Sequence, residues 1–196
     1  MTLLERFQTG LGDVGDALRR PEDFVVRWRD GSEHRSPAPL FVLLFNAALG
    51  LAVYGLTIDL HHGAPGMLAG ALKFPLAAGA AWGLALPALY IINSSLGSDL
   101  DWSTTLLAAL TTISFGGLAM LASVPINWFF SLALDYPFVH AIVNAVIFSG
   151  VGVCMIDVFL RVMKALEPMR SRLYSLIWLA LVATLGAELA ILFSLF

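Results

Sequence analysis

Three polar side chains, Lys73, Asn144 and Glu188, interrupt long apolar runs of this 196-residue sequence. At about 1.5 Å per helical residue, they fall at a similar depth in the membrane helices predicted below. A charge inside a bilayer is costly, so it is expected to reach water, find a partner or serve a function. Three alternatives stay open: Lys73 extends to the outer surface, it pairs with Glu188 as a structural bridge, or the three line a path for ions or protons.

Other residue types that carry chemistry are sparse in the sequence. It contains no H-E-x-x-H or G-x-S-x-G motif and no glycine-rich phosphate loop. His61 and His62 are adjacent, so a regular element cannot direct both toward one metal ion. The single Cys154 cannot form a disulfide within the chain. We therefore expect no catalytic residue, no metal site and no cofactor.

The composition indicates that the chain lies in a membrane. Hydrophobic residues make up 59% and charged residues 13% of the sequence, whereas soluble domains average about 45–50% and about 25%. The formal net charge of −3 gives no reason to expect nucleic acid as a partner. These values predict an all-α integral membrane protein whose first partner is the lipid bilayer.

Five hydrophobic segments are each long enough to cross a bilayer, which takes about 20 apolar residues. They are Leu40–Leu60, Met67–Asn93, Ser103–Ser123, Phe138–Leu160 and Leu173–Phe196. Pro75 and Pro87 are expected to kink the second segment because each removes a backbone donor. The third is expected to end at Pro125, followed by a short interfacial piece that carries Trp128.

Residues 1–38 are predicted to form a cytoplasmic region with an amphipathic helix and a linker, and residues 39–196 the transmembrane domain. Apolar residues recur at helical spacing over Met1–Arg20, and they include Phe7. Trp28 lies between Arg27 and Arg29, a composition typical of the headgroup layer. Phe7 and Trp28 are therefore candidate interfacial residues. The region either packs on the cytoplasmic ends of the bundle or lies on the lipid surface.

The basic residues predict the orientation. Of the eleven lysines and arginines, all but Lys73 either precede the first segment or lie between the fourth and the fifth. Short loops rich in these residues stay in the cytoplasm. An odd number of crossings puts both groups on one side, so we expect a cytoplasmic N-terminus and an outer C-terminus, in a plasma (inner) membrane.

Small residues follow helical spacing on three of the segments, the last of which carries Ala183, Ala187 and Ala190. Gly79 and Gly83 form a G-x-x-x-G pattern, and one stripe of the fourth segment is formed by Ala141, Ala145, Ser149 and Gly152. Such stripes let helix backbones approach closely in lipid. They predict helix packing, either within one molecule or between subunits.

In topology, Leu40–Phe196 resembles the Yip1-domain family of membrane proteins: five crossings, a cytoplasmic N-terminal region and a short outer C-terminus. The family's Tyr-Gly-Pro motif is absent, and the sequence has Leu89-Tyr90-Ile91 instead. The resemblance implies a membrane-organising or trafficking-type partner protein without catalysis.

Two functions are consistent with these features. The first is a non-enzymatic membrane subunit that self-associates, or binds partner membrane proteins, to organise a larger assembly. The alternative is a small homo-oligomeric ion channel or transporter that uses the polar layer of Lys73, Asn144 and Glu188.

Overall fold

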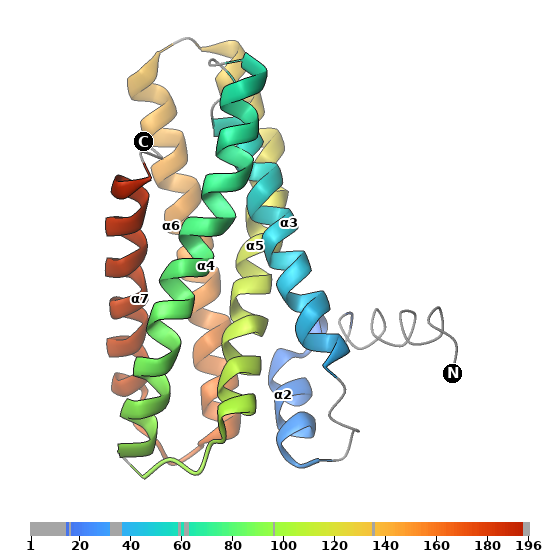
Figure 1. Cartoon of the computed structure of the whole chain (residues 1–196), viewed down its shortest axis with the longest axis vertical. Coiled ribbons are helices and arrows are strands. Elements are labelled where there is room, and N and C mark those ends of the chain that lie inside the picture. The colour runs from blue at the N-terminus through green and yellow to red at the C-terminus, as the bar shows by residue number, and fades with distance from the viewer. Residues whose placement is uncertain are drawn as a thin grey trace, which may run out of the picture.

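Five long helices lie roughly side by side, and a shorter helix packs at one end of the bundle (Figure 1). This computed structural model describes residues 15, 17–31, 37–58, 60, 63–95, 97–134 and 136–193. The predicted amphipathic stretch up to residue 14, including Phe7, lies outside the described residues, as do His61 and His62.

The described part of the chain is all-α and contains no strand. All five long helices are long and apolar enough to cross a membrane, which confirms the five predicted segments. The helices are α2 (Pro21–Arg29), α3 (Ala38–Ile58), α4 (Gly63–Ser95), α5 (Trp102–Ala133), α6 (Pro137–Leu166) and α7 (Arg172–Leu192). Helix α5 packs against α3 and α6, α3 also packs against α4, and α7 packs mainly against α4.

The sequence predicted that this helix ends at Pro125, but α5 runs through the proline to Ala133. The residues after the proline remain anchored to the bundle, because Asn127 and Ser131 are buried there. Asn127 also hydrogen-bonds Thr57 of α3. These contacts offset the backbone hydrogen bond that a proline removes, so the stretch predicted as a separate interfacial piece belongs to the helix.

Helix α2 begins at Pro21, a residue type favoured in the first turn of a helix. It packs against α6 and α5. Trp28 is only 3% exposed and lies in the core together with Phe24 and Val25. Of the two arrangements considered for this region, the described residues show the first, a helix that packs on the end of the bundle.

The same contact explains why α6 extends beyond the predicted Leu160. Val162, Met163 and Leu166 are buried in the core that includes α2. Arg161 bonds Asp157 of its own helix at 3.0 Å, the local pair expected at this spacing, and reaches Glu22 of α2 at 3.3 Å. Such exposed pairs are worth little each, so the apolar contact supplies most of the attachment.

We call the end of the bundle that carries α2 and the α6–α7 connection the basic end, and the opposite end the far end (Figure 1). Lys and Arg residues at the basic end include Arg27, Arg29, Arg161, Lys164, Arg170 and Arg172.

Glycines bring α3 into direct backbone contact with its neighbours. A Cβ added at Gly50 would lie 2.0 Å from the carbonyl oxygen of Gly117 in α5. One added at Gly55 would lie 2.4 Å from the carbonyl oxygen of Gly70 in α4. Since contacts below 3.0 Å do not occur, these two crossings require glycine.

We expect Gly50→Ala to lower the free energy of unfolding by about 1–3 kcal/mol, because the new methyl group meets backbone that cannot move aside. Thermal unfolding of the purified protein in detergent measures the change. Gly79→Ala is the matched control: its Cβ meets nothing within 4 Å, so stability should stay the same or rise with helix propensity. Equal effects of the two substitutions would contradict the tight α3–α5 crossing.

Candidate functional site

Asn144, one of the three predicted polar residues, is buried and hydrogen-bonded within the bundle. The hydroxyl group of Tyr54 in α3 donates to Oδ1 of Asn144 in α6 at 2.7 Å. The ring of Tyr54 contacts Phe74 of α4 and Phe148 of α6, with centroids 5.8 and 5.7 Å away. Asn144 therefore joins α3 to α6 inside an aromatic cluster.

A second hydrogen bond lies one turn further along α3. Asn127 of α5 donates from Nδ2 to the hydroxyl oxygen of Thr57 at 2.9 Å, and that hydroxyl donates to the carbonyl oxygen of Tyr54 at 2.7 Å. The sequence reasoning missed this group. Asn127 was the available signal, but it fell in the stretch after Pro125 that was not predicted to be part of a membrane helix.

Nearer the middle of the bundle, Asn46 of α3 donates to Ser114 of α5, at 2.7 Å to its hydroxyl oxygen and 3.2 Å to its carbonyl oxygen. Interhelical bonds of this kind contribute about 0.6–2 kcal/mol each in membranes. The polar groups inside the bundle thus hold α3 against α5 and α6.

Lys73 and Glu188 are placed differently from Asn144. Lys73 is half-buried on α4, and Glu188 is exposed on α7. Neither forms a hydrogen bond or ion pair with any residue that the structure describes. Within one copy, no described contact joins the three residues into a polar cluster.

The predicted small-residue stripes lie on the surface of the bundle. A Cβ added at Gly79 or Gly83 would meet nothing within 4 Å. Ala141, Ala145 and Ser149 are also exposed. These positions therefore do not mediate packing between the described helices of one copy, whereas Gly50 and Gly55 do.

Gly152, the last residue of the α6 stripe, lines an apolar groove between α4, α6 and α7. The groove has a volume of about 640 Å³. Its walls are mostly small side chains, among them Ala77 and Ala81 of α4 and, on α7, Ala180, Ala183, Gly186, Ala187 and Ala190. A deeper cavity of about 150 Å³ shares Phe74, Ala78, Trp82 and Met155 with it.

Trp178 fixes α7 to the bundle in the part of the groove nearest the basic end. Its ring lies 4.8 Å from that of Phe159 in α6 and 5.3 Å from that of Trp82 in α4. Its indole Nε1 donates to the carbonyl oxygen of Ala85 at 2.8 Å. Further along α7 the small residues leave the space beside it unfilled, so the groove is a consequence of the sequence of this helix.

Trp128, the other predicted interfacial residue, is 53% exposed near the far end of α5. It is followed by Phe129, which is also exposed. Among the described residues, no group of three His, Cys, Asp or Glu side chains could hold a metal ion.

No family model, curated protein or solved structure matches this chain.

We expect Tyr54→Phe to reduce the free energy of unfolding by about 0.6–2 kcal/mol, because it leaves Oδ1 of Asn144 buried without this donor. Thermal unfolding in detergent measures the loss. Tyr90→Phe is the control, since the Tyr90 hydroxyl makes no hydrogen bond with the described residues. If Tyr54→Phe were as stable as the control, the Tyr54–Asn144 bond would not contribute to stability.

Proposed function

We propose that this protein is a non-enzymatic polytopic membrane subunit that self-associates, or binds partner membrane proteins, to organise a larger assembly. The observation that carries the proposal is the surface position of its small-residue stripes. On the exposed surface of the bundle lie Gly79 and Gly83 of α4 and Ala141 and Ala145 of α6. These small residues would let the backbone of a neighbouring helix approach closely.

Helix association in lipid has no hydrophobic driving force between helices, because acyl chains are as apolar as leucine. Close backbone approach and hydrogen bonding replace it. Inside the bundle, the backbones of α3 and α5 approach closely in this way at Gly50 and Gly117. The equivalent surfaces on α4 and α6 are unused in one copy, which supports a further helix as their partner.

The two intramembrane charges support the same proposal. Lys73 and Glu188 have no partner among the described residues of one copy, and a charge at this depth gains from pairing. Contact between subunits would bring such a partner within reach. The topology-level resemblance to Yip1-domain proteins also agrees with a membrane-organising role.

We further propose that the basic end faces the cytoplasm of a plasma (inner) membrane, with the N-terminus on that side. The concentration of arginine and lysine at this end supports the orientation through the positive-inside rule. The far end, in contrast, presents exposed aromatic residues such as Trp128, Phe129 and Tyr136. Aromatic residues are enriched at membrane interfaces.

For self-association, we expect the purified protein in lipid nanodiscs or mild detergent to have a mass that is a multiple of the 21.1 kDa chain. Gly79→Leu with Gly83→Leu, or Ala141→Leu with Ala145→Leu, should weaken association at least tenfold for whichever stripe forms the contact. The bulky side chains would hold the backbones apart. Light scattering over a range of protein concentrations measures the effect.

Gly150→Leu is the control, because Gly150 is also exposed with open space around it but lies off the stripe. If the protein were a monomer at every concentration, and if neither double variant altered its crosslinking in the native membrane, both self-association and partner binding through these stripes would be contradicted. Ion flux in liposomes that Lys73→Met or Glu188→Gln abolishes would instead support the channel alternative.

For orientation, we expect single cysteines at Asp99 and Tyr136, introduced into a Cys154→Ser background, to react from opposite sides of the membrane. Both positions are exposed, Asp99 at the basic end and Tyr136 at the far end. A membrane-impermeant thiol reagent should label Tyr136→Cys in intact cells and Asp99→Cys only after permeabilisation. Labelling of both in intact cells would contradict the five-crossing topology.

A further inference from the structure

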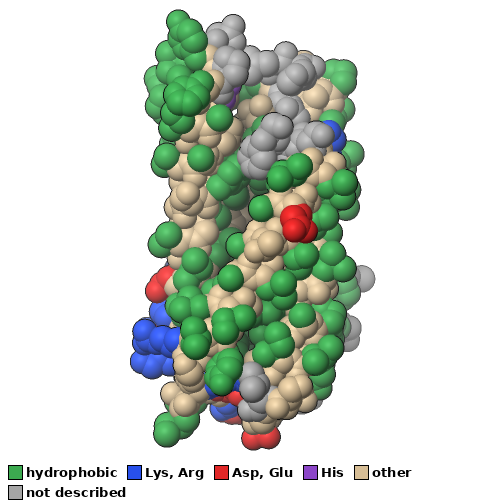
Figure 2. All heavy atoms as spheres, turned by 90° about the vertical axis from the view of Figure 1, so that its left-hand side faces the viewer, with side chains coloured by type: hydrophobic (Ala, Val, Ile, Leu, Met, Phe, Trp, Pro, Cys, Tyr) green, Lys and Arg blue, Asp and Glu red, His purple; other side chains and the backbone are tan. Residues whose placement is uncertain are grey.

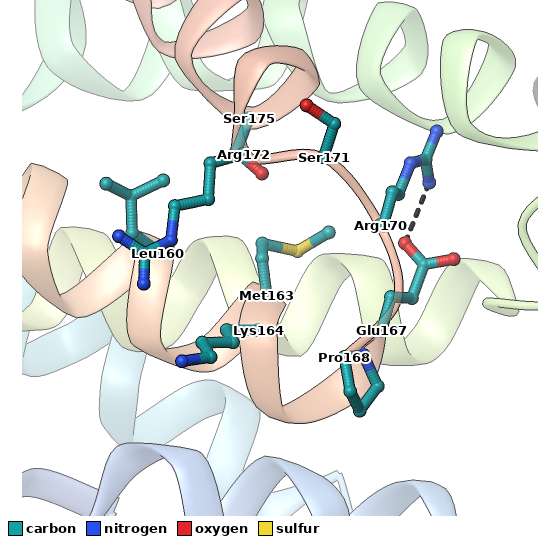
Figure 3. A pocket seen from close by; sticks show the side chains of 9 residues that line it. All are labelled: Leu160, Met163, Lys164, Glu167, Pro168, Arg170, Ser171, Arg172 and Ser175. Atoms are coloured by element: carbon teal, nitrogen blue, oxygen red, sulfur yellow. Dashed lines mark hydrogen bonds and ion pairs between the residues drawn. The ribbon is translucent and has the colours of Figure 1, made fainter.

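A small pocket with basic walls lies at the basic end, where α6 turns into α7 (Figure 3). Its volume is about 60 Å³, several times what one water molecule needs. The polar side chains around it are Lys164, Glu167, Arg170, Ser171, Arg172 and Ser175. Lys164 and Arg172 lie on one side of the pocket, opposite the Arg170–Glu167 pair.

The charges of this pocket do not cancel. Arg170 is neutralised by Glu167, whose carboxylate lies 2.7 Å from its guanidinium, and both side chains are mostly buried. Lys164 and Arg172 are exposed and form no ion pair with any described residue. One carboxylate against three cations leaves a formal charge of +2.

Arg172 also occupies a position that disfavours a cation. It is the first residue of α7, directly after the N-cap Ser171. The N-terminus of a helix carries partial positive charge, so an anion is stabilised there and a cation is not. A negatively charged group between Arg172 and Lys164 would remove this repulsion.

The apolar groove ends close to this pocket. On α6, Ile156 lines the groove and Leu160, one helical turn later, lines the pocket. On α7, Ser175 lines the pocket and Leu176 lines the groove. Polar and apolar sites are thus adjacent along the same two helices. In Figure 2, which views the bundle from the left-hand side of Figure 1, basic side chains gather toward the lower end and mostly apolar ones lie above them.

We propose that the pocket and the groove together bind one anionic phospholipid from the leaflet at the basic end. The phosphate group would lie between Lys164 and Arg172, and one acyl chain would lie in the groove along α7. Basic pockets between membrane helices on the cytoplasmic side recognise lipid headgroups in this way.

The dimensions of the groove agree with this occupant. From Leu176 to Ala190, the groove-lining part of α7 rises about 21 Å, which exceeds the depth of one leaflet, about 15 Å of a hydrocarbon core about 30 Å thick, so the groove is long enough for one acyl chain. The walls over this distance are apolar and mostly small, which suits a flexible chain. The positive charge at the basic end of the groove selects a lipid over an uncharged apolar ligand.

The test compares lipids that differ only in headgroup. Dioleoyl phosphatidylglycerol, added to the delipidated full-length protein, should bind as a retained adduct in native mass spectrometry and raise the melting temperature. Dioleoyl phosphatidylcholine should bind at least about tenfold more weakly. Lys164→Gln with Arg172→Gln should reduce phosphatidylglycerol affinity by about tenfold or more, to the phosphatidylcholine level.

Arg19→Gln with Arg20→Gln is the matched control, because it removes two exposed charges elsewhere at the basic end. It should leave the affinity unchanged. Ala183→Phe should block the groove and weaken binding of phosphatidylglycerol, whereas Ala122→Phe, at an exposed alanine outside the groove, should not.

If Arg19→Gln with Arg20→Gln lowered the affinity for phosphatidylglycerol as much as Lys164→Gln with Arg172→Gln does, the proposal would be overturned, because the attraction would then come from the overall charge of the basic end. Inorganic phosphate that stabilises the protein as strongly as phosphatidylglycerol, with Ala183→Phe having no effect, would also overturn it, in favour of a soluble phosphate ligand. Equal affinity for phosphatidylcholine would show that the basic pocket plays no part.

Discussion

The backbone contact between α3 and α5 is the constraint on which the rest of the bundle depends. Gly50 meets Gly117 with no room for a side chain, and Gly117 also lies against Ala47. Interhelical hydrogen bonds from Asn46 and Asn127 flank this crossing on both sides. Because helices in lipid gain little from burying apolar surface, these close approaches and hydrogen bonds determine how α3 and α5 are paired.

The other helices are arranged around this pair. Helix α5 has the largest buried share of the five spans, and some of its hydroxyl groups bond carbonyl oxygens of its own backbone. Thr112 donates to the carbonyl oxygen of Ala108, and Ser123 to that of Ala119. Such local bonds let polar side chains lie inside an apolar bundle without an unpaired donor. Helix α6 can then pack on α5, and α2 on the extension of α6.

Helix α7 is attached in a different way. Aromatic stacking and one hydrogen bond at Trp178 fix it to α4 and α6, while the alanines and glycine beyond leave a groove that opens beside it. The large side chain of Trp178 packs tightly against α4 and α6 near one end of α7, and the small side chains along the rest of the helix leave unfilled space beside it. The proposed lipid site follows from this contrast together with the charges at Lys164 and Arg172.

The sequence by itself determined the number and approximate extent of the membrane helices, because a bilayer requires about 20 apolar residues for each crossing and breaks in that pattern are easy to read. Spacing along one helix is also sufficient to bring Asp157 and Arg161, four residues apart, into an ion pair. The sequence did not predict that α5 continues past Pro125. Helix propensity argues against that continuation, whereas the burial of Asn127 and Ser131 and the hydrogen bond of Asn127 to Thr57 on another helix support it.

Only the tertiary structure decided which faces of the helices meet. Gly50 and Gly79 are both glycines on apolar helices, yet one touches backbone and the other lies in open space. Depth along the membrane grouped Asn144 with Lys73 and Glu188, but the rotation of each helix gave Asn144 a buried partner and left the two charges without one among the described residues. Trp28 is flanked by two arginines, as is typical of residues in the headgroup layer, yet its side chain is buried in the core. The physical reason is that periodicity gives the position of a residue on its own helix, whereas its neighbours depend on the relative rotation of two helices, which is set by contacts far apart in the sequence.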